Sequence, residues 1–320
     1  MIKKIIVSKN EAGERLDIFL QKKLVDFSRS QIQEAIKNGQ ILVNGLSSKA
    51  SLKIGDEDII EINFDFFENL SKPAELIGEK IPLDVLFEDE NIIVINKPSG
   101  MVVHPAHGNL TGTLVNALLD YAPEIISSKN DDSAYAAVRP GIVHRLDKDT
   151  SGIIIVAKNA KSLSSLSKQM HSKNINKTYT ALVYGDAAKS GEIKSYLGRD
   201  KIDRKKMAVQ DEANGKLAIT KYSKIQKYIY GKAELSLMKI EIPTGRTHQI
   251  RVQMKSIGLP VIGDQTYFSK ESKKISDELG IKRQLLHASK IVFHHPVNNK
   301  EIQIDSTLPT DFQAILGKIS

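Results

Sequence analysis

The sequence predicts an α+β protein: a catalytic domain built on a mixed or antiparallel sheet, preceded by a small α/β domain. Two observations favour this fold class. Strand-like segments in residues 83–320 follow one another through short turns and do not alternate regularly with helices, and residues 14–64 combine two short helical patterns with a hairpin signal. With 320 residues, 41% of them hydrophobic, the chain can build two cores. We expect domains at 1–75 and 83–320, joined by a linker at 76–82.

The amino-terminal segment predicts two helices and a small sheet. Leucine and phenylalanine recur at helical spacing within residues 14–24, and a second helical pattern covers 32–36. The pair Asn44-Gly45 fits a two-residue hairpin turn because both central positions need a positive φ, and residues 58–64 are expected to form a further strand. Residues 65–82 contain prolines and a glycine amid mixed charge, so all of them are interpreted as linker.

The larger segment predicts strands and helices in irregular order. Strands are expected at 91–96, 153–157, 179–184, 216–228, 233–242, 290–294 and 301–304. Helices are expected at 113–121, 160–171, 248–257 and 270–280. No glycine-rich phosphate-binding pattern occurs, so no bound dinucleotide or nucleoside triphosphate is expected.

Composition excludes several classes of site. The chain has no cysteine, which excludes disulfides, thiolate nucleophiles and cysteine-ligated metals, and which fits a cytoplasmic location. The longest aliphatic run, 153–157, is far shorter than the ~18–20 residues that a membrane span requires, and the first residues carry no signal-peptide pattern. The eight histidines show no zinc-like spacing. We expect no metal, no cofactor and no membrane association.

The net charge of +8 is concentrated in one part of the chain. Residues 1–75 hold 11 Lys/Arg against 12 Asp/Glu, whereas residues 189–232 hold 12 basic and five acidic side chains. A basic patch favours a polyanionic partner, since binding to phosphates releases counterions; a generally soluble, lysine-rich surface is the alternative. Within the first domain, basic side chains of the helical part are expected to meet phosphates; they include Arg15, Arg29, Lys37 and Lys49.

Residues 144–151 form a polar cluster between two apolar strand patterns. They comprise His, Arg, two Asp, Lys, Thr and Ser with a single Leu, more ionisable groups than a turn needs. Loops at strand ends are where catalytic groups usually lie. Arg145 and Lys148 flank Asp147 in sequence and favour its ionised form. Asp147 is therefore a candidate catalytic carboxylate, and a self-satisfied, salt-bridged surface loop is the alternative.

A second polar motif covers residues 244–258. Thr247 is expected to cap a helix that ends near Gly258, with His248, Arg251 and Lys255 on its polar face. A cation in the first helical turn is unfavourable beside the helix dipole, so Arg251 needs an anionic partner, either a carboxylate or a phosphate. A solvated basic face is the alternative.

Four ordered motifs resemble those of the RluA/RluD-type pseudouridine synthases: INKPSGMVVHP (95–105), HRLDKDTSG (144–152), KTY (177–179) and TGRTHQIRVQMKSIGLPVIGDQTY (244–267). Residues 14–64 resemble the S4 RNA-binding domain, and together the motifs look most like the D-type enzymes of large-subunit ribosomal RNA. Two residues depart from the family pattern: Gln253, where relatives often have His, and His107, which is usually a small residue.

The resemblance implies that uridine in RNA is isomerised to pseudouridine: the N1–C1′ bond breaks, the uracil turns, and C5 joins C1′. By motif, Asp147 is the catalytic carboxylate, Arg251 pairs with it, and Tyr179 stacks on the uracil and helps to move the C5 proton. Arg145 would fill the gap that the extruded nucleotide leaves in the RNA stack. Further RNA contacts are expected from His144, Lys148, Arg246 and His248.

The resemblance also implies a partner and a setting. The expected substrate is a stem-loop of large-subunit (23S) ribosomal RNA, free or within a ribosomal precursor, modified in the cytoplasm by a monomer. Two other functions stay open. Asp147 and Asp149 could be the acid/base pair of a hydrolytic N-glycosidase, or the chain could be a non-catalytic RNA-binding protein. Product analysis separates them, because a hydrolase releases uracil whereas an isomerase leaves the mass of the RNA unchanged.

Overall fold

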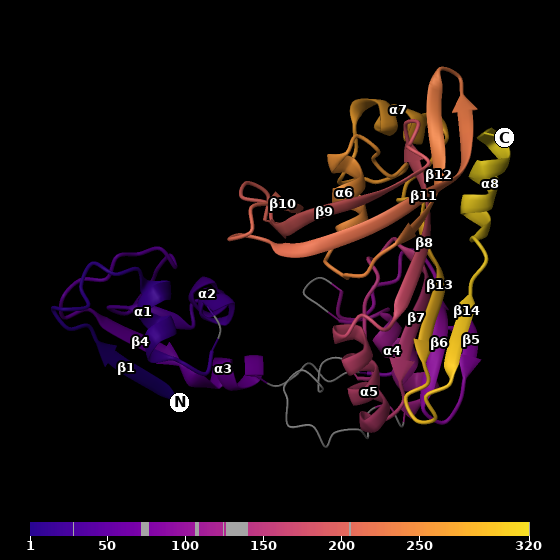
Figure 1. Cartoon of the computed structure of the whole chain (residues 1–320). Helices are drawn as coiled ribbons and strands as arrows, with labels where there is room; N and C mark the ends of the chain where they lie inside the picture. Colours follow the sequence, from indigo (N-terminus) through magenta and orange to yellow (C-terminus); the bar gives the residue numbers. More distant parts are fainter. Residues whose placement is uncertain are drawn as a thin grey trace. The chain divides into compact units, whose positions relative to one another are not determined.

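The structure, a computed structural model, describes residues 1–27, 29–71, 77–105, 109–123, 125, 140–204 and 206–319. Its internal contacts divide the chain into two units, Met1–Glu75 and Leu76–Ser320. In Figure 1 the first unit is indigo to purple, and the second runs from magenta to yellow. His107, one of the two departures from the family pattern, lies outside the described residues.

The described part of the first unit is a four-stranded antiparallel sheet with three helices. Its elements are β1 (Ile2–Ile6), α1 (Leu16–Lys23), α2 (Arg29–Lys37), β2 (Ile41–Val43), β3 (Leu46–Ser47), β4 (Ile59–Asn63) and α3 (Phe64–Ser71), and the strand order is β1-β4-β2-β3. The helical spacing of apolar residues buries Leu16, Phe19 and Ile32 in one core. Asn44 and Gly45 have φ values of 52° and 75°, which confirms the predicted hairpin turn.

The prediction of a linker over all of residues 65–82 is wrong at its beginning. Residues Phe64–Ser71 form helix α3, and Phe67 is fully buried in the core of the first unit. Its ring centroid lies 4.6 Å from that of Phe27, within the range of favourable aromatic contacts. The prolines and glycine that indicated a linker lie beyond these phenylalanines, so apolar burial decides the structure of the segment before them.

The second unit is built on one ten-stranded sheet. Its strands are β5 (Val85–Glu88), β6 (Ile92–Lys97), β7 (Ser151–Ala157), β8 (Asn176–Tyr184), β9 (Ser190–Arg199), β10 (Met207–Gln210), β11 (Lys216–Tyr230), β12 (Ala233–Glu241), β13 (Leu286–His294) and β14 (Glu301–Asp305). The order is β10-β9-β11-β12-β8-β13-β7-β6-β5, and β14 pairs with β13. Figure 1 shows β9 and β11 running across the direction of β6, β7 and β13, so the sheet curves strongly.

Five helices among the described residues accompany this sheet: α4 (Leu114–Tyr121), α5 (Ala160–His171), α6 (Gln249–Ser256), α7 (Lys270–Glu278) and α8 (Thr310–Ile319). Every strand and helix expected from residue 91 onward is present. Strands β5, β9 and β10 and helix α8 were not predicted, because their apolar patterns are short or irregular. The mixed sheet and the separate, smaller first unit agree with the predicted α+β class.

Strands β7 and β13 form a short parallel contact within this sheet. Ser151 and Gly152 pair there with His287 and Ala288. Gly152 has a φ of 112°, and a Cβ built there would collide with the backbone of Ala288, so this close approach requires glycine. The polar loop that precedes β7 is thereby fixed at its end against the centre of the sheet.

Candidate active site

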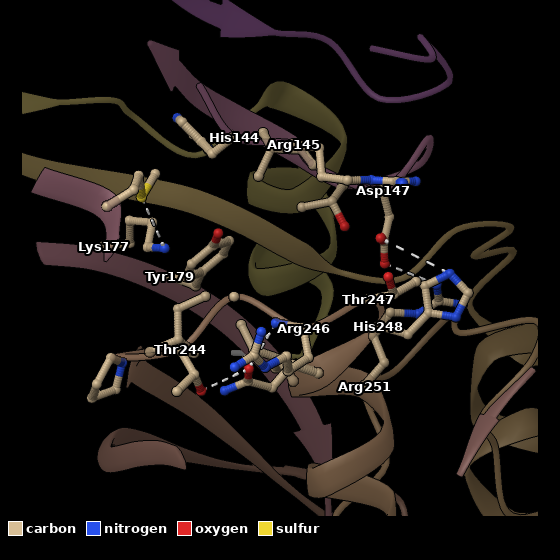
Figure 2. A pocket seen from close by; sticks show the side chains of 18 of the residues that line it. His144, Arg145, Asp147, Lys177, Tyr179, Thr244, Arg246, Thr247, His248 and Arg251 are labelled. Atoms are coloured by element: carbon tan, nitrogen blue, oxygen red, sulfur yellow. Dashed lines mark hydrogen bonds and ion pairs between the residues drawn. The ribbon is translucent and has the colours of Figure 1, made fainter. Parts of the chain in front are cut away.

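A cavity of about 420 Å³ opens in the second unit (Figure 2). Its walls come from three segments: the loop before β7, the end of α5 with β8, and residues 242–251 before and within α6. Figure 2 shows Asp147, His248 and Arg251 close together, with Tyr179 and Lys177 further along the wall. Seven of the predicted site residues line the cavity: His144, Arg145, Asp147, Tyr179, Arg246, His248 and Arg251.

The loop that carries Asp147 is held by a buried lysine. Lys97, at the end of β6, is fully buried, and its Nζ donates hydrogen bonds of 2.7–3.0 Å to the carbonyl oxygens of Pro98, Met101 and Lys148. Burial lowers the pKa of Lys97 to about 7. The backbone N–H of Gly100 donates to the same Lys148 carbonyl at 2.9 Å. The motif at 95–105 therefore fixes the backbone of the loop at Lys148, next to Asp147.

Residues 283–287 hold the other end of this loop. Gln284 donates to the Thr150 hydroxyl at 3.2 Å, and His287 shares a 2.9 Å hydrogen bond with Ser151. Arg283 donates to the carbonyl oxygen of Asp149 at 3.3 Å, and its guanidinium is paired with Asp311 of α8. The loop thus has contacts on both sides of Asp147, which limit where the carboxylate can lie.

Arg251 lies between two carboxylates. Its NH1 donates to Oδ2 of Asp147 at 3.0 Å, while Nε and NH2 donate to Asp264 at 2.7 and 2.9 Å. Burial favours the neutral form of Arg251, but the hydrogen bonds and charges of Asp264 and Asp147 outweigh it and raise its pKa above the usual value. The structure therefore contains the anionic partner that a cation in the first turn of α6 required, and it contradicts a solvated basic face at this residue.

The beginning of α6 differs from the prediction. The cap residue is His248 and not Thr247; it has a φ of 54° and makes no side-chain capping hydrogen bond. The side chain of Gln249 accepts from the backbone N–H of Arg246 at 3.0 Å and from the hydroxyl of Thr244 at 2.9 Å, and these contacts fix the turn instead. A left-handed conformation is costly for a non-glycine residue. Here it accompanies the approach of the His248 ring to Asp147, with Nε2 3.9 Å from Oδ1.

Asp264 is a site residue that the sequence analysis missed. It is 2% exposed, and it accepts backbone hydrogen bonds from Thr266 and Tyr267 at 2.8 and 2.9 Å. Burial would raise the pKa of Asp264, but the hydrogen bond with Arg251 lowers it below the usual value. The need of Arg251 for an anion was a signal for such a residue, although it did not indicate which of 38 acidic residues supplies it.

Tyr179 lies in the wall of the cavity, 6% exposed. Burial and the negative charge of Asp147 raise its pKa above the usual value, so its phenol is neutral near neutral pH. His248 is also neutral there, because burial lowers its pKa against the opposing charge of Asp147. The Asp147 carboxylate thus lies beside a neutral imidazole, with a neutral phenol further along the wall of the same cavity (Figure 2).

Two other predicted RNA contacts have different surroundings. His144 accepts a hydrogen bond from the backbone N–H of Ile155 at 3.0 Å, and burial, assisted by the charge of Lys177, lowers its pKa to about 3. It is therefore a neutral part of the wall. Lys148 is exposed and is not among the described residues that line the cavity. Arg145 and Arg246 are exposed as well as lining it, so they can reach a bound polymer.

The four basic residues predicted in the first unit occupy different positions. Arg15 and Arg29 are 43% and 44% exposed, and both pair with the buried carboxylate of Asp17. Lys37 is exposed, and Lys49 lines a separate hollow around the β2–β3 hairpin. Of these four, the two arginines share a common partner, which fixes the positions of their guanidinium groups.

Gln253, the other departure from the family pattern, is fully buried, and its described hydrogen bonds do not involve Asp147. It accepts from the Thr220 hydroxyl at 2.6 Å and donates to Ser195 at 2.9 Å, so it ties α6 to strands β9 and β11.

Among the described residues, no group of three or more His, Cys, Asp or Glu could hold a metal ion. No described helix is long and apolar enough to cross a bilayer.

Comparison with known proteins identifies two families along the chain. Residues 91–256 match the RNA pseudouridylate synthase family, and residues 14–60 match the S4 domain. The chain is 38% identical over 316 residues to the uncharacterized RNA pseudouridine synthase YlyB of Bacillus subtilis (strain 168), covering 98% of this chain and 97% of that protein. It is 36% identical over 315 residues to ribosomal large subunit pseudouridine synthase D of Zymomonas mobilis, covering 97% and 95%.

A solved structure shares the fold of the second unit. Human RNA pseudouridylate synthase domain containing 1 aligns with a TM-score of 0.56 at 23% identity, covering 72% of this chain and 85% of that chain.

Proposed function

The chain belongs to the RNA pseudouridylate synthase family, and we propose that it isomerises uridine in large-subunit ribosomal RNA, with Asp147 as the catalytic carboxylate. One observation supports this assignment most directly. The Asp147 side chain is 18% exposed and lines the cavity, and its Oδ2 accepts a 3.0 Å hydrogen bond from a guanidinium that Asp264 holds in place. An anion fixed in this way can attack or deprotonate a bound ribose without first having to be oriented.

The substrate must leave its RNA stack before it can reach this carboxylate. Extrusion of a nucleotide costs a few kcal/mol, which stacking inside the protein can offset. Tyr179 provides an aromatic face in the cavity wall, and Arg145 is exposed at the cavity, where its guanidinium can occupy the gap left in the RNA. Both roles agree with the positions of these side chains.

The reaction needs one carboxylate and no water. Asp147 acts either as a nucleophile at C1′ or as a base at C2′, and both routes break N1–C1′ with the bonding electrons passing to the uracil. The ring then turns and C5 bonds to C1′; in the first route the bond between Asp147 and C1′ breaks at this step, and in the second route Asp147 returns its proton to C2′. The C5 proton is finally lost while N1 gains one. Because Tyr179 is a neutral phenol, it can accept the C5 proton only as it gives up its own.

The RNA target is inferred from the relatives. Three proteins named ribosomal large subunit pseudouridine synthase D align with 96–99% of this chain at 35–38% identity. We infer a stem-loop of 23S ribosomal RNA as the substrate, modified in the cytoplasm where ribosomes assemble. We also propose that a monomer is active, because Asp147, Tyr179 and Arg251 come together in one cavity without a second copy of the chain.

Hydrolysis is the second candidate reaction, and the geometry favours it less. An N-glycosidase with an acid/base pair would need a second carboxylate facing the same substrate. Asp149 is not among the described residues that line the cavity, and its carbonyl oxygen is bound by Arg283. Mass spectrometry of the reacted RNA tests this directly: we expect an unchanged mass and no free uracil.

The native target can be mapped by carbodiimide treatment and reverse transcription of RNA from cells with and without the protein. We expect pseudouridine-dependent stops to disappear from a stem-loop of 23S ribosomal RNA when the protein is absent. Retention of every ribosomal stop, with loss of stops from transfer RNA only, would contradict the proposed target but leave the isomerase activity intact.

A further inference from the structure

Lys177 is a half-buried cation in the wall of the cavity. It lies near the start of β8, and within the described part of the chain no carboxylate is within ion-pair distance of its Nζ. The contact that the ammonium does make is a weak one, to the sulfur of Met170 at 3.8 Å (Figure 2). A Cβ built on Gly245 would lie 3.4 Å from the same Nζ. The ammonium therefore packs beside Gly245, where a larger side chain would crowd it.

The other cations of the cavity differ from Lys177. Arg251 is buried but shares two carboxylates, and Arg246 is exposed and donates to the carbonyl oxygen of Leu217. Arg145 is also exposed. Burial lowers the pKa of Lys177, and no neighbouring acid in the described part of the chain opposes that shift. An ammonium partly withdrawn from water, without an anion or a full set of acceptors, is destabilising, so its presence in the cavity wall points to a ligand.

The position of Lys177 indicates which ligand. Residues two apart on a strand point to the same face, so Lys177 and Tyr179 face the cavity together. In the view of Figure 2, the Lys177 ammonium lies on the opposite side of Tyr179 from Asp147. A uracil stacked on Tyr179 with its ribose at Asp147 would therefore direct its far edge, which carries a carbonyl oxygen, toward Lys177.

We propose that Lys177 is a catalytic residue that binds a carbonyl oxygen of the extruded uracil and stabilises the negative charge on the ring once N1–C1′ has broken. The inference rests on the proposed roles of Asp147 and Tyr179. Lys177 keeps its proton throughout. The electron pair of the broken bond is delocalised onto the carbonyl oxygens, and it returns when C5 bonds to C1′ and the C5 proton is exchanged for one on N1. A preformed donor aimed at developing charge is among the largest contributions to catalysis.

The symmetry of uracil makes one cation sufficient for both halves of the reaction. A half-turn about the axis through N3 and C6 exchanges N1 with C5 and, at the same time, O2 with O4. A fixed ammonium that meets one carbonyl oxygen in the substrate therefore meets the other in the product orientation. Lys177 can hold the detached ring in the cavity while it turns, which keeps the base from escaping as free uracil.

A backbone phosphate is the alternative ligand, and the observations favour it less. Phosphates lie outside the stack of bases and are reached by exposed cations such as Arg246. Lys177, by contrast, is half-buried in the cavity wall beside the aromatic ring that the base is expected to cover. The two ligands differ in a measurable way, since a phosphate contact contributes to the salt dependence of RNA affinity whereas a carbonyl contact does not.

The test compares Lys177→Met, a neutral side chain of similar length, with Lys161→Met as the matched control. Lys161 is exposed on α5 and does not line the cavity. In single-turnover assays with the RNA substrate, we expect Lys177→Met to lower the rate of pseudouridine formation about 100- to 1,000-fold. The dissociation constant for RNA and its salt dependence should match the wild type, and Lys161→Met should react at the wild-type rate.

Other outcomes overturn the proposal. A wild-type rate for Lys177→Met refutes a catalytic contact, and weaker RNA binding with a smaller salt slope at an unchanged bound-state rate assigns Lys177 to a phosphate. Asp147→Asn is assayed in parallel: if it stays active, the failure lies in the proposed active site and not in Lys177 alone.

Two further measurements separate catalysis from folding. Because Lys177 is half-buried without an anionic partner among the described residues, Lys177→Met should unfold in urea at the same or a higher midpoint than the wild type, although it is slower in catalysis. In the shortened variant Lys177→Ala, ethylammonium ion should restore part of the rate. Ethylammonium should not change the rate of Lys161→Met. A lowered midpoint together with no recovery by ethylammonium would mean that Lys177 is structural, which refutes the proposal.

Discussion

The two units each contain an ion-pair cluster centred on a buried charge, and the two clusters have opposite polarity. In the first unit the buried member is the carboxylate of Asp17, fully buried, and the exposed members are Arg15 and Arg29. In the second unit the buried members are Asp264 and Arg251, and the more exposed member is Asp147, at 18%. In the first cluster Asp17 orients the two arginines, and in the second cluster Arg251 orients Asp147. The first cluster therefore offers cations to a partner, and the second offers a single anion.

This difference predicts different roles. Exposed cations held at fixed positions can bind the phosphates of RNA, so we expect them to determine the affinity of the protein for RNA. A fixed anion inside a cavity repels phosphates, so we expect it to affect the reaction rate and not the affinity for RNA. The predictions below test whether rate and affinity can be separated along these lines.

The largest effect is expected from Asp147→Asn, which removes the exposed anion and keeps the shape of the side chain. The single-turnover rate should fall by about 10⁴-fold or more, as for other residues that take part directly in bond breaking. The dissociation constant for RNA should stay within about twofold of the wild type or improve slightly, since a negative charge is removed. Filter binding and rapid quench of the same RNA measure both quantities.

Asp264→Asn should affect both the rate and the fold. It leaves the buried guanidinium of Arg251 without its bidentate partner, and loss of one member of a buried pair costs about 3–5 kcal/mol of unfolding free energy. Arg251 would then hold Asp147 less well, and we expect a rate loss of roughly 10- to 100-fold, smaller than that of Asp147→Asn. Urea unfolding and single-turnover kinetics give the two numbers. An unchanged rate would mean that Asp264 does not position the site.

Substitution of the exposed cations in the first unit should lower the affinity for RNA without changing the rate of the bound complex. In Arg15→Gln/Arg29→Gln, the slope of log affinity against log salt should fall by about 0.9 for each phosphate that the protein no longer neutralises, and binding should weaken by roughly tenfold. The rate measured at saturating protein should equal that of the wild type. If the bound-state rate falls while the salt slope is unchanged, the proposed division between the two clusters is wrong.

The smallest effect concerns acid stability of the first unit. Burial would raise the pKa of Asp17, but its hydrogen bonds from Arg15, Arg29 and Gln33 lower it well below the usual value. The ionised carboxylate thus stabilises the unit above the unfolded pKa of about 3.9, and this stabilisation is lost as the pH falls through the lower, folded pKa. The deficit in Asp17→Asn should therefore be largest near neutral pH and shrink below about pH 3.9. Amide hydrogen exchange in α1 and α2 can follow it.

The sequence predicted elements with strong local patterns and missed those that depend on distant partners. The apolar periodicity of α1, the Asn44-Gly45 turn and strands β6–β8 and β11–β14 were predicted, because each has a local cause. Helix α3 was assigned to a linker because Pro73 and Gly78 follow it, while its stability comes from contacts such as that of Phe67 with Phe27.

The same division holds at the candidate site. Asp147, Arg251 and Tyr179 were named from short motifs, and the structure brings them to one cavity. Asp264 and Asp17 were not named, since their importance lies in charges that face them across the fold, and an isolated aspartate in a sequence carries no sign of its partner. The left-handed conformation of His248 was also missed, because Thr247 satisfied the local rules for a cap.

The link from α8 to the loop of Asp147 has a practical consequence for work with this protein. Asp311 holds Arg283, and Arg283 donates to the carbonyl oxygen of Asp149, two residues after the proposed catalytic carboxylate. We expect a truncation that removes Thr310–Ile319, or a fusion partner that unwinds this helix, to loosen the loop of Asp147 from a distance, so that kinetic constants from shortened or tagged preparations would differ from those of the intact chain.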